Sequence, residues 1–88
     1  MKLIKDLTGI DVIHCPTEEV CRKVGEMIGN VCWIKWDRFK SKTCLRGKFA
    51  HESLNWYKAS SLYKDNILDG QDFINFNTKP QQLNYILW

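Results

Sequence analysis

The spacing of apolar residues in the first third of the chain predicts one strand followed by one helix. Residues 10–15 are rich in β-branched side chains, which favour a strand, and Pro16 ends that run. Thr17 then suits the N-cap of a helix, because its hydroxyl can accept a backbone N–H. Apolar residues recur behind it at helical spacing, at Val20, Val24, Met27 and Ile28. Gly29 and Asn30 form a stop signal, so we expect an amphipathic helix that ends there.

From Val31 onwards the apolar residues follow a period near two, which predicts β-strands. In residues 31–36, alternate side chains would share one face of such a strand. Residues 43–49 alternate in the same way, as expected for a strand with one solvated face. The polar residues 37–42 predict a turn, so the two strands are expected to form a hairpin. Residues 51–63 fit a further strand or a short helix, and both alternatives stay open.

The last third of the chain predicts a strand, a short helix and a polar linker. Residues 63–68 favour a last short strand. Asp69 then resembles the N-cap of a helix of one or two turns that carries Phe73 and Ile74. Residues 75–82 are polar and read as a linker.

These elements predict an α+β fold. We expect a small antiparallel or mixed sheet of three to four strands, with one main helix packed on one face and a short second helix. Residues 1–76 are expected to form a single domain, and residues 77–88 a C-terminal tail with an apolar end. That end would either dock back on the domain or form a homodimer interface. The residues available for a homodimer are Leu83, Tyr85, Ile86 and Trp88.

The composition is that of a globular domain rather than of a disordered or membrane-spanning chain. The 88 residues are 44% hydrophobic and 26% charged, and no run approaches the ~20 apolar residues of a membrane span. The formal net charge of +3 permits an anionic partner without requiring one. The first residues lack the apolar core and cleavage site of a signal peptide. We therefore expect a cytoplasmic protein whose four cysteines are buried thiols rather than disulfides.

A cluster of cations interleaved with aromatic rings is the strongest candidate for a binding surface. Six cations lie between residues 35 and 48, opposed by Asp37 alone. Trp, Tyr and Arg dominate protein interfaces, so the leading hypothesis is non-catalytic binding to a protein partner. The same groups suit phosphates and bases, so binding of nucleic acid or a nucleotide is the alternative. The candidate partner-binding residues are Trp33, Trp36, Arg38, Phe39, Lys40, Lys42 and Arg46.

The residue types that carry catalysis or metal binding show no diagnostic spacing. The four cysteines and two histidines lack the close ligand pairs that structural zinc sites use. His14 and Cys15 would point to opposite faces of a strand. Glu18 and Glu19 diverge on a helix, and acidic residues in a first turn interact with the helix dipole. We therefore expect neither an enzyme nor a bound metal or other cofactor.

Three stretches carry a resemblance to a known kind of protein. They are DLTGIDVIHCPTEEVCRKVGEMIG at residues 6–29, VCWIKW at residues 31–36 and ILDGQDFINF at residues 67–76. With these stretches the chain resembles small uncharacterised accessory proteins encoded in bacteriophage genomes. Proteins of that kind often act on a host process or block a defence system, as anti-CRISPR proteins do, by binding. The resemblance implies a viral inhibitor of a host or defence protein, or a sponge for a nucleotide signal.

Overall fold

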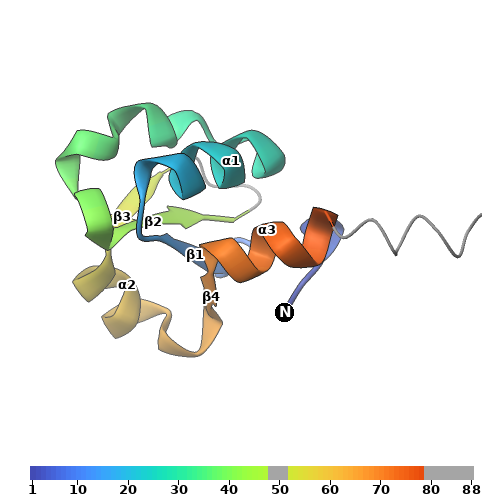
Figure 1. The fold of residues 1–88 in the computed structure, drawn as a ribbon. Coiled ribbons are helices and arrows are strands. Elements are labelled where there is room, and N and C mark those ends of the chain that lie inside the picture. Colours follow the sequence, from blue (N-terminus) through green and yellow to red (C-terminus); the bar gives the residue numbers. More distant parts are fainter. Residues whose placement is uncertain (48–51, 79–88) are drawn as a thin grey trace, which may run out of the picture.

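Two central strands, β1 (Val12–Cys15) and β2 (Thr43–Arg46), organise residues 1–47 and 52–78, the part of the chain that the computed structural model describes (Figure 1). β2 pairs antiparallel with β1 and with β3 (Ser53–Asn55), and β4 (Ile67–Asp69) pairs parallel with β1. The strand order is β3-β2-β1-β4. The predicted α+β fold with a small mixed sheet is therefore confirmed.

The predicted first helix is α1 (Glu18–Ile28), and it begins and ends where the sequence indicates. The Val20 N–H donates to Thr17 Oγ1 at 3.2 Å, which caps the first turn. Gly29 closes the helix with a φ of 72° and donates its N–H to the carbonyl of Gly25. Only glycine adopts that left-handed conformation without a steric cost. Local signals thus specify this helix before any packing is considered.

The sheet separates two hydrophobic cores, because successive side chains of a strand point to opposite faces. On one face, Ile13 and Leu45 pack with α1 and with Phe73 of α3 (Gly70–Thr78). On the other face, α2 (Trp56–Leu62) covers a smaller cluster of Val12, Cys44, Leu54 and Ala59. Residues 43–45 of β2 are all buried, so the solvated face expected for this strand is wrong there.

Residues 31–36 do not form the predicted strand. They belong to η2 (Val31–Arg38), a 3-10 helix with a kink at Lys35, and η3 (Lys40–Lys42) follows it. The hairpin expected between residues 31–36 and 43–49 is therefore also wrong. β2 pairs with β1 and β3 instead. The segment runs along the same face of the sheet as α1 before it enters β2 (Figure 1).

Packing explains why η2 is helical despite its apolar alternation. Val31 and Ile34 are 62% and 67% exposed, whereas Trp33 and Trp36 pack against the α1 core. Exposed and packed side chains thus repeat every three residues, which is the period of a 3-10 helix. A strand would have placed Trp33 and Trp36 on opposite faces.

The remaining elements resolve the alternatives at residues 51–63. Both occur in turn: β3 ends at Asn55 and α2 starts at Trp56. The short η4 (Lys64–Asn66) then precedes β4, so the strand predicted at 63–68 is confirmed in a shorter form. At the other end of the chain, η1 (Ile4–Asp6) leads to the buried Leu7.

The last helix, α3, is capped as predicted but is longer than one or two turns. The Asp72 N–H donates to Asp69 Oδ2 at 3.0 Å. Residues 75–78 belong to α3, so the linker expected to begin at residue 75 is wrong over that range. The predicted apolar tail and its homodimer residues, together with Lys48, Phe49 and His51, lie outside the described residues.

Three of the four cysteines lie in the two cores. Cys15, Cys21 and Cys44 are buried thiols, as predicted, and Cys32 is half-buried at the α1 core. Within residues 1–47 and 52–78, no helix is long and apolar enough to cross a bilayer.

Candidate functional site

Two of the predicted binding residues, Trp33 and Trp36, are packed against the protein's own core. Both rings are half-buried beside the residues that α1 contributes. The Arg22 guanidinium lies 5.5 Å from the centroid of the Trp33 ring, an attractive cation–π geometry. The structure therefore places these two tryptophans between η2 and α1, where they hold the two elements together.

Arg46 is committed to contacts within the protein. Its Nη2 and Nε donate to the carbonyl of Gly9 at 2.7 and 3.2 Å. Its Nη1 donates to Glu52 Oε1 at 2.9 Å, and the guanidinium lies 5.4 Å from the centroid of the Tyr63 ring. These contacts join the loop before β1 to the start of β3, so we leave Arg46 out of the candidate site.

The remaining predicted residues follow one another in the segment that leads into β2, and the last of them, Lys42, contacts α2. Lys42 Nζ donates to Tyr57 Oη at 2.8 Å and lies 4.4 Å from the centroid of that ring. Trp56 packs edge-on against Tyr57, with ring centroids 5.8 Å apart. We call this surface the aromatic–basic face, and define it as Arg38, Phe39, Lys40, Lys42, Trp56 and Tyr57.

Local structure explains how these side chains reach the surface. Asn55 Oδ1 accepts the Tyr57 N–H at 2.9 Å and caps α2, which leaves the first two residues of the helix at its exposed end. Trp56 and Tyr57 are 38% and 61% exposed. On the other side, the carbonyl of Ser41 contacts His14 Nε2 at 2.9 Å and fixes η3 to β1.

The sequence contained a signal for the two aromatic residues that the prediction missed. Asn55 is an N-cap residue immediately before Trp56, and WYKASSL places Ala59 on the inner side of one helical turn. Because residues 51–63 fitted a strand as well, the cap alone did not decide the exposure of the rings.

The charge of the aromatic–basic face is positive. The segment from Lys35 to Lys42 holds four cations and one carboxylate, Asp37, and the exposed Lys58 lies on α2. The Arg38 guanidinium lies 5.0 Å from the centroid of the Phe39 ring. The ion pairs found in the described part of the chain use other cations: Lys2–Asp11, Arg22–Glu18 and Arg46–Glu52. The face is therefore suited to an acidic partner.

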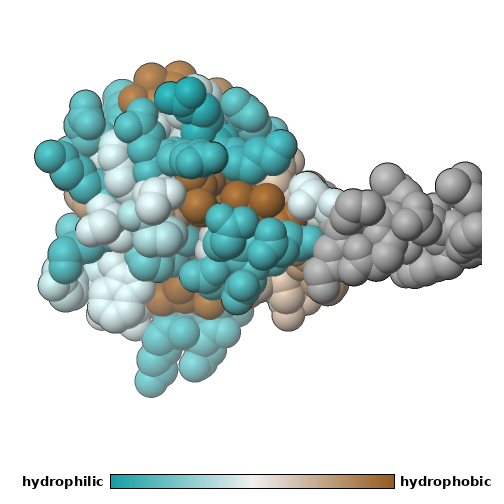
Figure 2. Space-filling model, viewed as in Figure 1, coloured by the Kyte–Doolittle hydropathy of each residue, from teal (hydrophilic) through white to brown (hydrophobic). Residues whose placement is uncertain are grey.

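A second surface feature is an open groove of about 610 Å³ between α1 and α3. Its apolar floor includes Val20 and Ile74, and Figure 2 shows hydrophobic residues between hydrophilic ones at this position. Charges of both signs line it, from Glu19, Arg22, Lys23 and Glu26. These charges do not converge on one ligand chemistry, so the groove is a weaker candidate than the aromatic–basic face.

His14 lies between a thiol and a carboxylate on neighbouring strands, but the thiol is not activated. It pairs in register with Cys44 on one side and Asp69 on the other. Burial raises the pKa of the Cys44 thiol to about 12, with a smaller contribution from Cys21. A reactive cysteine needs a lowered pKa and solvent access. Within residues 1–47 and 52–78, no three His, Cys, Asp or Glu side chains are placed to hold a metal ion.

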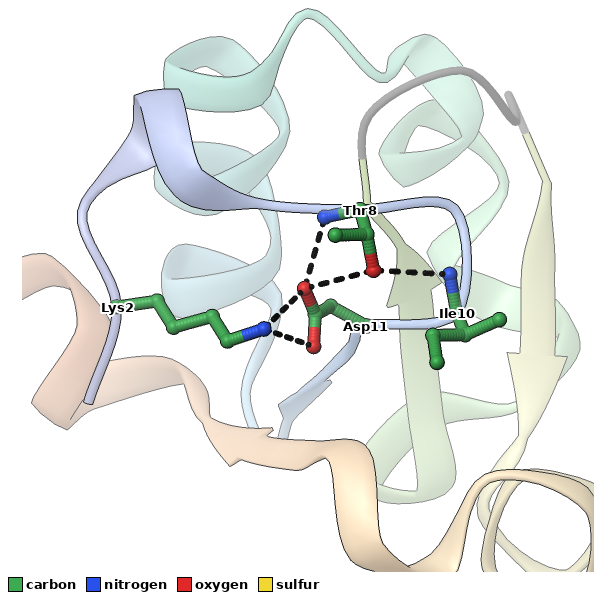
Figure 3. A network of polar contacts seen from close by, with 4 residues as sticks. All are labelled: Lys2, Thr8, Ile10 and Asp11. Carbon is green, nitrogen blue, oxygen red and sulfur yellow. Dashed lines mark hydrogen bonds and ion pairs between the residues drawn. The ribbon is translucent and has the colours of Figure 1, made fainter.

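Asp11 accepts several hydrogen bonds in a polar network outside the face (Figure 3). Its side chain, 1% exposed, accepts hydrogen bonds from Lys2 Nζ at 2.9 and 3.0 Å. It also accepts the Thr8 N–H at 2.8 Å and the Thr8 hydroxyl at 3.1 Å. Burial alone would raise the pKa of Asp11, but the hydrogen bonds from Lys2 and Thr8 outweigh it and lower the pKa. The network fixes the loop before β1.

No protein-family model matches this chain, and no curated protein or solved structure is significantly similar to it.

Proposed function

We propose that this protein is a non-catalytic binding protein that docks its aromatic–basic face on an acidic surface of a partner protein. The observation that carries the proposal is the exposed Tyr57 ring, held in place by Lys42 on one side and Trp56 on another. Exposed aromatic rings next to cations are the side chains that supply most of the binding energy in protein interfaces.

The contacts within the face reduce the entropy that binding would cost. Tyr57 is restrained by a hydrogen bond and an edge-on ring, and Arg38 lies against Phe39. Immobilising a free side chain costs about 0.5–1.5 kcal/mol on association. Rings that are already held lose less freedom, so the same contact area gives tighter binding.

The resemblance to bacteriophage accessory proteins suggests which partner the face would meet. On that basis the partner is a host or defence-system protein, and binding blocks its activity by covering a functional surface. An acidic target fits the cations at Arg38, Lys40 and Lys42, and their field would also accelerate association.

The test combines affinity capture from a bacterial lysate with a charge-reversal variant. A protein retained after nuclease treatment is identified, purified and titrated against wild type and the double variant Arg38→Glu/Lys40→Glu. We expect affinity to fall by about tenfold or more, because two attractive charges become repulsive. Circular dichroism and thermal melting should be unchanged, since both side chains are exposed.

The matched control is Lys5→Glu/Lys64→Glu, which changes net charge equally at exposed positions on η1 and η4. It should bind the partner like wild type. Unaltered binding by the Arg38/Lys40 variant, or equal loss in the control, would remove the aromatic–basic face as the binding site.

Binding of nucleic acid or a nucleotide is the second candidate function, and one observation favours it. Tyr57 exposes a ring for base stacking while Lys42 places an ammonium group beside it, the combination that single-stranded nucleic acid requires. Retained material that disappears with nuclease, or a small absorbing ligand released on denaturation, would support this candidate. Its affinity should fall steeply with added salt, because phosphate contacts release counterions.

A further inference from the structure

The strand β3 lies at the edge of the sheet, next to the aromatic–basic face. It is the first strand in the order β3-β2-β1-β4, and Figure 3 draws it as the outermost arrow at the right. Thr43 pairs in register with Asn55, so Lys42 and Trp56 flank the same end of the two strands. A partner that covers the face therefore also meets the β3 edge.

Two hydrogen bonds determine which backbone groups of β2 turn towards each neighbour. The Gly47 N–H donates to the carbonyl of Asp11 at 2.7 Å, on the β1 side. The Arg46 N–H donates to the carbonyl of Glu52 at 3.1 Å, on the β3 side. Hydrogen bonds alternate between the two sides of a strand, so Cys44 also bonds towards β3.

The same alternation identifies the outward groups of β3. Cys44 faces Leu54 in the register, so the Leu54 backbone bonds inwards to β2. The N–H groups of Ser53 and Asn55 and the carbonyl of Ser53 then point away from the sheet. In the part of the chain that the structure describes, no strand pairs with this side of β3. Outward backbone groups of an edge strand are a template for another strand.

The surroundings of the edge select the kind of strand. Three outward groups form few hydrogen bonds, so side-chain anchors are needed, and Trp56 and Tyr57 supply them at the end of β3. Lys42 and Lys58 bring positive charge to the same place. Like charges across the junction would disfavour a second copy of this chain, whereas acidic side chains would be attracted.

We infer that the partner contributes an extended acidic segment, which pairs with the outer edge of β3 while its side chains contact the aromatic–basic face. The inference rests on the proposed function and specifies the partner's conformation and charge at that site. Backbone hydrogen bonds set the register of the segment, and the rings and cations select its sequence.

The first measurement uses a defined probe, an acetylated and amidated peptide of about eight residues in which Glu and Val alternate. It is titrated into the isotope-labelled full chain and followed by NMR. The Ser53 and Asn55 amide signals should shift, and their hydrogen exchange should slow, while the Leu54 amide keeps its existing bond. A peptide with Lys in place of Glu should not bind.

The variant Ser53→Pro removes one outward N–H and leaves the face intact, and proline is tolerated on an edge strand where its nitrogen faces outward. We expect its affinity for the peptide, and for any partner protein captured as above, to fall about tenfold or more. Ser53→Ala keeps the N–H and should bind like wild type. If the proline variant unfolds, a semisynthetic chain ligated at Cys44 can carry an N-methylated residue 53. This change removes the same backbone N–H donor without introducing proline.

The outcomes separate this inference from the proposed function. Shifts confined to Trp56 and Tyr57, or full affinity in the Ser53→Pro variant, would overturn strand pairing and leave the aromatic–basic face standing. Absence of binding by the Glu–Val peptide, or equal binding of the Lys peptide, would also overturn the inference. A wild-type dimer in sedimentation that Ser53→Pro abolishes would make the occupant a second copy instead. The proposed function would be removed as well only by unaltered binding of the Arg38/Lys40 variant or by an equal loss of binding in its control.

Discussion

At the scale of single residues, Gly25 controls how closely η2 approaches α1. A Cβ at this position would lie 2.7 Å from the carbonyl oxygen of Asn30 and would overlap Cδ1 of Trp33. The tryptophan ring thus occupies the space that a side chain at position 25 would fill. The close approach lets Arg22, on the same helix, lie over the same ring.

The variant Gly25→Ala should lower the free energy of unfolding by about 1–2 kcal/mol. Alanine would gain about 1 kcal/mol from helix propensity, but overpacking should cost about 2–3 kcal/mol here, because the backbone of Asn30 cannot move freely. Urea unfolding followed by circular dichroism measures the difference. Glu26→Ala, an exposed change one residue away, should alter stability by less than about 0.5 kcal/mol. A Gly25→Ala protein as stable as wild type would show that the Trp33 ring can relocate.

At the scale of elements, Asn30 connects η2 to the sheet. The residue is 2% exposed and its Oδ1 accepts the Cys32 N–H at 2.9 Å, which caps η2. Its Nδ2 donates to the carbonyls of Arg46 and Glu52 at 3.1 and 3.3 Å. One side-chain amide therefore joins the start of η2 to the end of β2 and to the residue before β3.

We expect Asn30→Ala to lower the free energy of unfolding by about 2–3 kcal/mol, because buried groups lose their partners. Hydrogen exchange should quicken in η2 and at the start of β3 before it does so in α1. Asn75→Ala, at an exposed amide of α3 that hydrogen-bonds Gln71, is the matched control and should change little. Uniform acceleration across all elements would instead indicate that η2 does not open separately.

Elements differed in how far the sequence could predict them, and a comparison of α1 with η2 shows why. α1 was predictable because Thr17, its apolar stripe and Gly29 act within the helix itself. η2 was not, because its period of three depends on where Trp33 packs, beside Gly25 and under Arg22. An apolar alternation such as VCWIKW fits a strand until that packing is known.

The charged residues of the candidate site could be predicted from the sequence, but which side chains are exposed to solvent could not. Arg38, Lys40 and Lys42 could be identified from the cluster of cations in the sequence. Arg46 could not be set apart from them, because its partner, the carbonyl of Gly9, is 37 residues away in the chain. Tyr57 was missed because its exposure depends on where β3 ends. The strand ends at Asn55, which places Tyr57 in the exposed first turn of α2.

At the scale of the whole molecule, Asp11 ties the start of the chain to the sheet. Its carboxylate binds Lys2 and Thr8, and its carbonyl accepts the Gly47 N–H after β2. The carboxylate contacts stay within the first residues of the chain (Figure 3), whereas the Gly47 contact joins segments that are far apart in sequence. The carboxylate holds the chain before β1 in place, and because a small domain unfolds cooperatively, its charge state affects the free energy of unfolding.

Stability should consequently decrease in acid through Asp11. Its pKa is lowered in the folded protein, so the carboxylate stabilises the fold above its unfolded pKa, and this contribution is lost as pH falls through the folded pKa, below about pH 4. We expect Asp11→Asn to be less stable than wild type at pH 7 and to show a smaller loss on acidification. Urea unfolding at neutral and acidic pH tests this, with Asp6→Asn on η1 as the control. Parallel pH profiles for wild type and Asp11→Asn would contradict the assignment.

The buried thiols provide a way to follow the two sides of the sheet separately. Cys15 and Cys21 belong to the cluster under α1, and Cys44 to the cluster under α2. None of the three exposes surface, and the pKa values of Cys15 and Cys44 are raised, so an alkylating reagent reaches them only when a layer opens. With Cys32 replaced by serine, the alkylation rate of each remaining cysteine, measured by mass spectrometry, gives the rate at which the helical layer over it opens. The labelling rates of Cys15 and Cys21 thus report the opening of one core, and the labelling rate of Cys44 reports the opening of the other.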